Sequence, residues 1–406
     1  QSISGGGGMG GSTDPSANLI SEPHEIIGKS IETIENWVAI SQFFRADGPL
    51  PASYVAKVGV GGQGGTSGIA GVVDVNNHGQ IQTTGHRSFG ILAQSIGGGG
   101  GTGGSVMSDG SAVASSLSGG VGIGALSGMV FSASVKVGGS DGASGGGNTV
   151  NITQTGPSSI VTAGYGSHGI VAQSIGGGGG VGADGSIASN YYAHGDASVA
   201  GGVTGGFTVT LGSTSTQSIG SGGAVNYTSS NTYNPNASGS FWPSITTYGD
   251  NAVGILAQSI GGGGGIGSGG CTNNGLSANA SACFVNTAMT PGTSTPINFI
   301  NSGQSMTFAI NSGVASITPS NGGAVNINSL DTINVFGSGS IGIAAQSIGG
   351  GGGLILGNSA NIAAATLPAM GTFLGTGGPV SVTVGHEINL ASSATGSIGV
   401  LAQSIS

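Results

Sequence analysis

Hydrophobic and polar residues alternate in short stretches along most of the chain, and the same stretches return in the same order. In one unit the alternation runs through VVDVNN, GQIQTTG and GILAQSI, and in the next unit through TVNITQ, SSIVTAG and GIVAQSI. Alternation over about 4–8 residues, bounded by Gly, Asn, Ser and Asp, predicts short β-strands. We therefore expect an all-β chain.

The stretch AQSIGGGGG returns without change along the chain. Its copies are Ala93–Gly101, Ala172–Gly180, Ala257–Gly265 and Ala345–Gly353. A β-sandwich also consists of short strands, but it needs no repeated sequence, whereas a β-solenoid lays each strand on the same strand of the preceding coil. The repeat therefore favours a β-solenoid that is similar to a parallel β-helix, with several coils in each unit or one coil with excursions.

The repeat divides the chain into units of unequal length. Residues 1–11 end a preceding repeat with the sequence QSISGGGG, and residues 12–54 form an inserted segment. The units that follow are 55–107, 108–186, 187–270 with an excursion at 229–243, 271–358 with a disulfide loop at 271–283, and a partial unit at 359–406. The tetrapeptide QSIS occurs at both ends, which indicates a longer period that runs from Gln1 to Gln403.

The glycine runs need an explanation, because ordering five glycines costs about 5–10 kcal/mol and leaves no side chain to bury. Their constant length and the mostly apolar residues that follow them favour ordered runs, and the alternative is a flexible loop. Only glycine lets two backbones approach without a Cβ atom between them. We expect stacked extended strands or left-handed threefold polyglycine rods. The first and last members of the runs are Gly97 and Gly101, Gly176 and Gly180, Gly261 and Gly265, and Gly349 and Gly353.

The glutamine of each AQSI sequence has apolar neighbours on its own face. In an extended strand Leu92, Gln94 and Ile96 point to one side. A buried amide that stacks on an identical amide in the adjoining layer can donate and accept a hydrogen bond. We predict such a ladder, and the alternative is that the glutamines face water. The ladder residues are Gln94, Gln173, Gln258, Gln346 and Gln403.

One segment departs from the repeat. Between Asp14 and Asp47 the charged residues gather and glycine almost disappears. Ser21 is suited to an N-cap and Pro23 to the first turn, and apolar residues follow at helical spacing. We predict an amphipathic helix that covers the flank or end of the solenoid or, alternatively, contacts another subunit. The candidate contact residues are Ile27, Ile31, Ile34, Trp37, Val38 and Phe44.

Composition and charge narrow the functions. The chain has 406 residues with 90 glycines and only 5% charged residues, whereas typical domains have about 7% glycine and about 25% charged residues. So little charge favours an assembly over a free monomer. The net charge of −9, with five Lys and Arg, leaves no basic patch for nucleic acid. No apolar run reaches the about 20 residues that a membrane-spanning helix needs, so we expect no transmembrane segment in these residues.

Residues that could support chemistry are few. Cys271 and Cys283 bracket a polar stretch and predict a disulfide that pins a loop, worth about 2–4 kcal/mol. The histidines are scattered, and no catalytic triad spacing, nucleophile elbow or zinc motif occurs. We therefore expect no catalysis, no metal and no cofactor. The excursion at 229–243 carries Phe241 and Trp242 and is a candidate contact loop.

The sequences GQIQTTGHRSFGILAQSIGGGGGTGG, SIVTAGYGSHGIVAQSIGGGGGVGADG and VKVGGSDGASGGGNTVNITQTG resemble the glycine-rich repeats in the passenger regions of large proteobacterial autotransporters, which are adhesin-like surface proteins. The resemblance covers most of residues 55–406 apart from excursions near 229–243 and 271–300. It implies a β-solenoid that is secreted to the surface of a Gram-negative bacterium and has an adhesive or matrix role. The inserted segment does not belong to this repeat pattern.

Two classes of function follow. The first is an extracellular structural protein whose repeats stack into a stiff surface fibre or filament, so that its partners are copies of itself. The alternative is an adhesin or binding module for a carbohydrate or a host or abiotic surface, with ice binding through Thr rows such as QTTG as a less favoured form. An enzyme comes a distant third, because no motif supports it.

Overall fold

The structure is a computed structural model whose regular elements are all β-strands. It describes residues 1–3, 7–9, 16–20, 53–60, 68–85, 87–98, 100–102, 106–114, 130–137, 145–181, 185–193, 203–211, 220–234, 239–268, 270–274, 281–284, 295–298, 304–312, 319–356, 365–367 and 375–406. The predicted all-β class is confirmed for these residues. None of them belongs to a helix that is long and apolar enough to cross a membrane.

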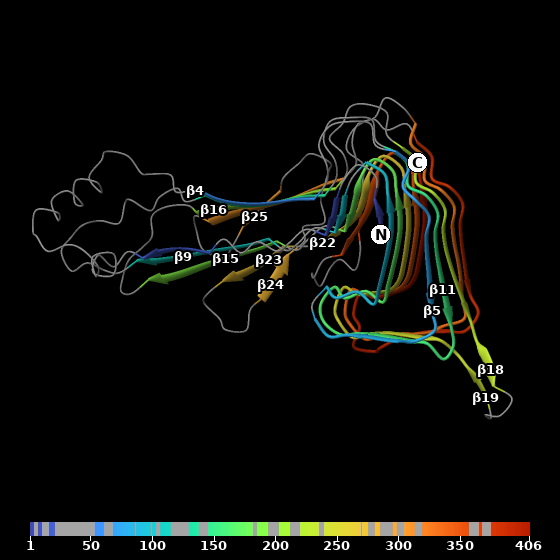
Figure 1. The fold of residues 1–406 in the computed structure, drawn as a ribbon. Helices are drawn as coiled ribbons and strands as arrows, with labels where there is room; N and C mark the ends of the chain where they lie inside the picture. The colour runs from blue at the N-terminus through green and yellow to red at the C-terminus, as the bar shows by residue number, and fades with distance from the viewer. Residues whose placement is uncertain are drawn as a thin grey trace, which may run out of the picture.

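Four sheets form the body of the molecule (Figure 1). The Gln sheet, which carries the AQSI sequences, consists of β1 (Ser2–Ile3), β7 (Ile91–Ile96), β13 (Ile170–Ile175), β21 (Val253–Ile260), β29 (Ile341–Ile348) and β34 (Ile398–Ile405). The Gly sheet consists of β2 (Gly7–Met9), β8 (Gly100–Thr102), β14 (Gly179–Val181), β22 (Gly264–Ser268), β30 (Gly352–Leu356) and β31 (Ala365–Leu367). The Asn sheet consists of β5 (Val73–Asn77), β11 (Val150–Thr155), β17 (Val225–Ser230), β27 (Val325–Ser329) and β32 (Val380–Val384). The aromatic sheet is named for Trp242, Tyr248 and Phe336, which flank two of its strands. It consists of β6 (Gln80–Thr83), β12 (Ser159–Thr162), β20 (Ser244–Thr247), β28 (Thr332–Val335) and β33 (Glu387–Leu390).

Two further sheets extend away from this body as an arm, and a small hairpin projects elsewhere (Figure 1). The first arm sheet consists of β4 (Ser53–Val60), β10 (Val130–Val137), β16 (Val203–Leu211), β26 (Gln304–Ser312) and β25 (Thr295–Asn298). The second arm sheet consists of β3 (Ser16–Ile20), β9 (Val106–Ala114), β15 (Gly185–Ala193), β23 (Gly270–Asn274) and β24 (Ser281–Phe284). The hairpin consists of β18 (Thr232–Asn234) and β19 (Gly239–Phe241).

Successive repeats add successive strands to the same sheets, in parallel. From β10 to β15 the chain passes once through the first arm, Asn, aromatic, Gln, Gly and second arm sheets, and β16 then returns to the first arm sheet. Partners across strands hold equivalent positions, so that Ile170 pairs with Ile91 on one side and Ile255 on the other. The side-chain period of a strand is two, so a slip of one residue would turn every buried side chain outward.

The main hydrophobic core lies between the Asn, aromatic and Gln sheets. It is built of columns of identical or similar residues, such as Ile160, Ile245 and Ile333 in the aromatic sheet. A second core joins the other face of the Gln sheet to the Gly sheet, where Leu256 packs with Ile266. The Gln sheet is therefore buried on both faces, which agrees with the burial of every residue of β21 and β29.

The predicted inserted helix falls on residues that the structure does not describe. Within the segment 12–54, Ser16–Ile20 forms β3, and Ser53 and Tyr54 begin β4. Residues 21–52 lie outside the described residues. The candidate contact residues Ile27, Ile31, Ile34, Trp37, Val38 and Phe44 all belong to this range.

Candidate functional site

A continuous ladder of glutamine side chains runs through the molecule. Gln94 Nε2 donates to Gln173 Oε1 at 2.8 Å, and Gln173 donates to Gln258 in the same way at 2.8 Å. The bonds from Gln258 to Gln346 and from Gln346 to Gln403 are both 2.7 Å. Gln1 Nε2 extends the ladder by donating to Gln94 Oε1 at 2.6 Å.

The middle of the ladder lies in the interior of the molecule, whereas Gln1 is exposed and Gln403 is half-buried. Gln94, Gln173, Gln258 and Gln346 are completely buried, so the alternative that they face water is wrong. In surroundings of low dielectric constant a hydrogen bond is strengthened and an unpaired amide is penalised. Each rung therefore stabilises the alignment of two repeats and penalises any other alignment.

The glycine runs make room for this ladder. Gln94 Nε2 lies 3.5 Å from the carbonyl oxygen of Gly101, and a Cβ atom on Gly180 would lie only 3.1 Å from that amide nitrogen and 2.0 Å from the Gly101 oxygen. Gly265 and Gly353 repeat this arrangement, because a Cβ on either residue would lie 1.8 Å from a carbonyl oxygen of the preceding strand. Any side chain at these positions would therefore clash with a neighbouring backbone.

The described runs contain paired extended backbone. Gly179 and Gly180 pair in parallel with Gly264 and Gly265. Gly179 and Gly180 have φ angles of 128° and 132°, which belong to the region that favours glycine. Gly177 and Gly178 have φ angles of 75° and 84°. The last glycines of the run thus stack as strands, one of the two geometries that the sequence allowed.

The first glycine of each run is required by a different neighbour. A Cβ atom on Gly97 would lie 1.9 Å from the carbonyl oxygen of Gly145, and one on Gly176 would lie 1.8 Å from that of Gly220. Gly261 and Gly349 have equally close backbone neighbours, at 2.2 Å and 2.4 Å. These neighbours belong to the segments that lead into the Asn sheet, so the first glycines allow the chain to cross closely at this corner.

The serine of AQSI fastens the same corner, a role that the sequence reasoning missed. Ser174 Oγ donates to the carbonyl oxygen of Asn148 at 2.7 Å and accepts from the amide of Gly223 at 2.7 Å. Ser259 and Ser347 make the equivalent pairs of bonds, all at 2.7 Å. The signal was present, because serine follows glutamine in every AQSI copy.

A buried carboxylate joins three repeats at the corner between the Asn and aromatic sheets. Asp331 is completely buried. Its Oδ2 accepts hydrogen bonds of 2.7 Å from Tyr227, Ser229 and Ser329, and its Oδ1 accepts one of 3.1 Å from Gln154. Burial, followed by the charge of Asp331 and the hydrogen bond to it, raises the pKa of Tyr227 well above 10. Tyr227 therefore stays protonated and donates to the carboxylate.

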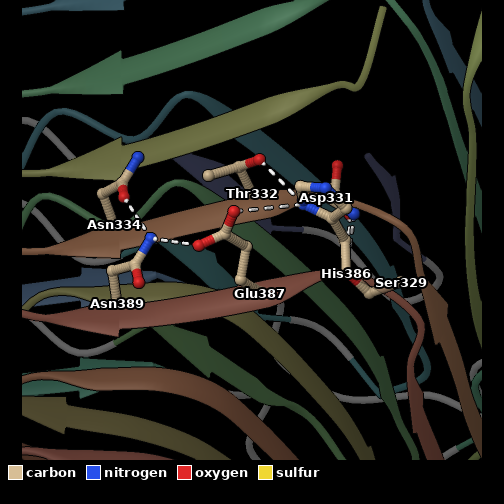
Figure 2. Close-up of polar contacts among 7 residues, drawn as sticks. All are labelled: Ser329, Asp331, Thr332, Asn334, His386, Glu387 and Asn389. Carbon is tan, nitrogen blue, oxygen red and sulfur yellow. Dashed lines mark hydrogen bonds and ion pairs between the residues drawn. The ribbon is translucent and has the colours of Figure 1, made fainter. Parts of the chain in front are cut away.

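A second network lies on the outer face of the aromatic sheet (Figure 2). Asn389 Nδ2 donates to Asn334 Oδ1 and to Glu387 Oε2, at 3.1 Å in both cases. His386 Nδ1 lies 3.0 Å from Thr332 Oγ1 and 4.0 Å from Glu387 Oε1. This network is partly exposed, in contrast to the carboxylate of Asp331 on the inner side of the same sheet.

Among the described residues, His168 is the one buried histidine. His168 is buried, and its Nδ1 accepts a hydrogen bond of 3.1 Å from the backbone amide of Val253. Burial, and secondarily the charge of Arg87, lower the pKa of His168 from 6.5 to about 3. Within the described ranges no group of three or more His, Cys, Asp and Glu residues could hold a metal ion.

Cys271 and Cys283 are direct partners in the antiparallel pair of β23 and β24. Facing residues of antiparallel strands have Cα atoms about 4.5–5.5 Å apart, within the range that a disulfide spans. The predicted disulfide between them stays a prediction.

No protein-family model, curated protein or solved structure matches this chain.

Proposed function

We propose that this chain is a β-solenoid that serves as an extracellular structural element, with no catalysis of its own. The order of the strands supports a solenoid, because β4–β9 and β10–β15 visit the six sheets in the same sequence, and the later strands are added to these same sheets. One pass corresponds to one AQSI repeat. Each layer is thus joined to its neighbours by several sets of backbone hydrogen bonds at once.

The observation that carries the proposal is the unbroken glutamine ladder. It extends from Gln1 beside β1 to Gln403 in β34, the two outermost strands of the Gln sheet. Catalysis would not require a stack of identical buried amides. The stack instead fixes the same strand register in every layer.

The dimensions explain why such a chain would work with copies of itself. The six strands of the Gln sheet define five intervals, which span about 24 Å at about 4.8 Å each. Each pass runs through several sheets, but no sheet contains more than six strands, so the stack is short along its axis. A fibre therefore needs further passes, supplied by tandem repeats or by other copies of the chain.

We also propose that the protein works at the surface of a Gram-negative bacterium. This part rests on the resemblance of its repeats to autotransporter passenger regions and on the very low content of charged residues. A surface fibre needs few charged residues, because hydrogen bonds between its layers stabilise it.

Electron microscopy and X-ray fibre diffraction test the proposal on the purified chain. We expect filaments whose diffraction has a spacing of about 4.8 Å along the fibre axis, since strands lie across the axis. Particles that stay dispersed at all concentrations, or filaments with strands along the axis, would contradict it. The variant Gln258→Leu should shorten or abolish the filaments, whereas Gln82→Leu, an exposed glutamine on β6, should leave them unchanged.

A further inference from the structure

The outer face of the aromatic sheet presents a line of side chains that begins and ends with an aromatic ring. Along β20 and the residues that flank it, Trp242, Ser244, Thr246 and Tyr248 alternate with buried residues and therefore point to the same side. On the adjacent strand β28, Thr332 and Asn334 continue to Phe336 on this side, which is exposed like Tyr248.

Exposed aromatic residues gather on this face. Trp242 is 36% exposed, Tyr248 53% and Phe336 44%. The other aromatic residues whose side chains the structure describes, Phe89, Tyr165 and Tyr227, are partly or fully buried. Aromatic rings left in water cost free energy, and their concentration in one place marks a binding surface more often than chance.

The rings are held in fixed orientations. Tyr248 and Phe336 stack with their centroids 4.8 Å apart and their planes within 13°. Trp242 stacks on His386 with a centroid distance of 4.4 Å and an angle of 25°. The residues that follow the neighbouring strands at the level of the first pair, Ala163 and Ala391, have small side chains.

The space between the two aromatic pairs is lined mostly by neutral polar groups. Thr246, Asn334 and Asn389 form a row that is joined by hydrogen bonds of 3.4 Å and 3.1 Å. Glu387 is the only acid among these side chains and bonds to Asn389, as Figure 2 shows. Amides, hydroxyls and one carboxylate offer both donors and acceptors and carry little charge.

The length of the face matches an extended ligand. Trp242 and Tyr248 flank β20 and are six positions apart, which in an extended chain corresponds to about 20 Å at about 3.3 Å per residue. A ligand that covers both pairs must be elongated, must have flat apolar faces for the rings, and must carry many hydroxyl groups for the row of amides.

We propose that this face binds a neutral polysaccharide. The apolar faces of its sugar rings rest on Trp242 at one end and on the Tyr248–Phe336 pair at the other. Its hydroxyl groups exchange hydrogen bonds with Thr246, Asn334 and Asn389 between them. An anionic polymer is disfavoured by Glu387 and by the lack of Lys and Arg in the strands that the structure describes for this sheet. The site does not depend on fibre formation, so it goes beyond the structural role proposed above.

The first test uses affinity electrophoresis in gels that contain hydroxyethylcellulose, galactomannan or dextran. We expect at least one of these neutral polysaccharides to retard the wild-type chain. Trp242→Ala and the double variant Tyr248→Ala with Phe336→Ala should each weaken binding by tenfold or more. Ile69→Ala, which removes an apolar side chain that is 73% exposed on another surface, should bind as the wild type does. No retardation by any of the three polymers, or full retention of binding by the variants, would overturn the proposal.

A second test does not depend on the stability of these variants. The chain has two tryptophans, so Trp37→Phe leaves Trp242 as its only indole. Short oligosaccharides of the retarding polymer should shift the emission of Trp242 and saturate. Absence of a shift would contradict the assigned position of the sugar.

A third measurement separates a sugar from a second copy of the chain. Sedimentation velocity should give the same oligomeric state for the wild type and Trp242→Ala. If the substitution instead converts an oligomer to a monomer and leaves polysaccharide binding unaffected, the face is a contact between copies and the proposal is wrong.

Discussion

Gln173 donates a hydrogen bond of 2.8 Å to Gln258, although the two residues lie 85 positions apart in the chain. The bond forms only if the whole intervening pass through six sheets returns to the same register. Because each ladder glutamine makes the equivalent bond, an error in one pass would leave buried amides unpaired on both sides of it. The ladder therefore fixes the alignment of successive repeats although their lengths differ.

Gln258→Leu should destabilise the chain strongly. The substitution leaves Gln173 Nε2 without its acceptor and Gln346 Oε1 without its donor, and each buried group left unsatisfied costs about 1–3 kcal/mol. Urea unfolding followed by circular dichroism measures the loss. Gln82→Leu on the exposed side of β6 is the matched control. Equal effects of the two substitutions would show that the ladder contributes nothing.

Much of the fold could be predicted from the sequence because its information is repeated. Alternation in each copy predicts the strands, and the copies reveal which strands pair, since equivalent residues stack on one another. The ladder of Gln94 and its equivalents could be predicted for the same reason, because a glutamine between apolar neighbours returns in every copy.

Contacts between unlike residues could not be predicted in this way. Asp331 accepts a hydrogen bond from Gln154, 177 positions away, and neither residue belongs to a repeated motif. The exposed rings of Trp242, Tyr248 and Phe336 likewise lie where the copies differ. The alternation of Trp242 and Tyr248 on either side of β20 is visible in the sequence, but their placement beside Phe336 after β28 and His386 before β33 depends on the order of strands in the sheet.

Gly265→Ala should prevent normal packing of the Gly sheet. Its Cβ would lie 1.8 Å from the carbonyl oxygen of Gly180, and its φ angle of 139° strains any residue with a side chain. We expect a loss of several kcal/mol, or failure to fold, in thermal unfolding. Gly399→Ala provides the control, because a Cβ there has no atom within 4 Å. A normal melting temperature for Gly265→Ala would disprove the role assigned to the glycine runs.

His168 should make the chain sensitive to acid. Its pKa falls from 6.5 to about 3 in the fold, because burial and then Arg87 disfavour the charged ring. Between these values the unfolded chain binds a proton that the folded chain does not, so stability decreases as the pH falls below 6.5. The contribution is about 1.4 kcal/mol per pH unit in this window.

Urea unfolding between pH 7 and pH 4 measures this slope for the wild type and for His168→Asn. The asparagine carbonyl can still accept from the amide of Val253, but it does not titrate. We expect the variant to have a shallower slope than the wild type. Parallel slopes for the two chains would mean that His168 is protonated without cost.

The pairing of Cys271 with Cys283 predicts that the oxidised chain contains a disulfide that closes the β23–β24 hairpin. The intact mass should lie below that of the reduced chain by two hydrogen atoms. Reduction should lower stability by about 2–4 kcal/mol through the larger freedom of the unfolded loop. Cys283→Ser should abolish both differences, and an unchanged mass after reduction of the wild type would exclude the bond.

Tyr227→Phe tests whether the carboxylate of Asp331 holds three repeats together. The substitution removes one of the four hydrogen bonds to a buried charge, and such a bond to a charged group contributes about 1.5–3 kcal/mol. We expect a loss of this size at pH 7 in urea unfolding. Tyr248→Phe, which removes a hydroxyl group from an exposed ring, should change stability by much less.

The response to alkali distinguishes this hydrogen bond from simple packing. The pKa of Tyr227 is raised above its ordinary value by burial and by Asp331, so above pH 10 the folded chain keeps a proton that the unfolded chain releases. Stability must then fall as the pH rises above 10, and Tyr227→Phe should lessen that fall because it has no proton to release. Asp331→Asn removes the charge that helps to raise the pKa, so the phenol should ionise at lower pH, visible in the ultraviolet absorbance of tyrosinate. An unchanged alkaline profile in both variants would mean that Tyr227 fills space and does not serve the carboxylate.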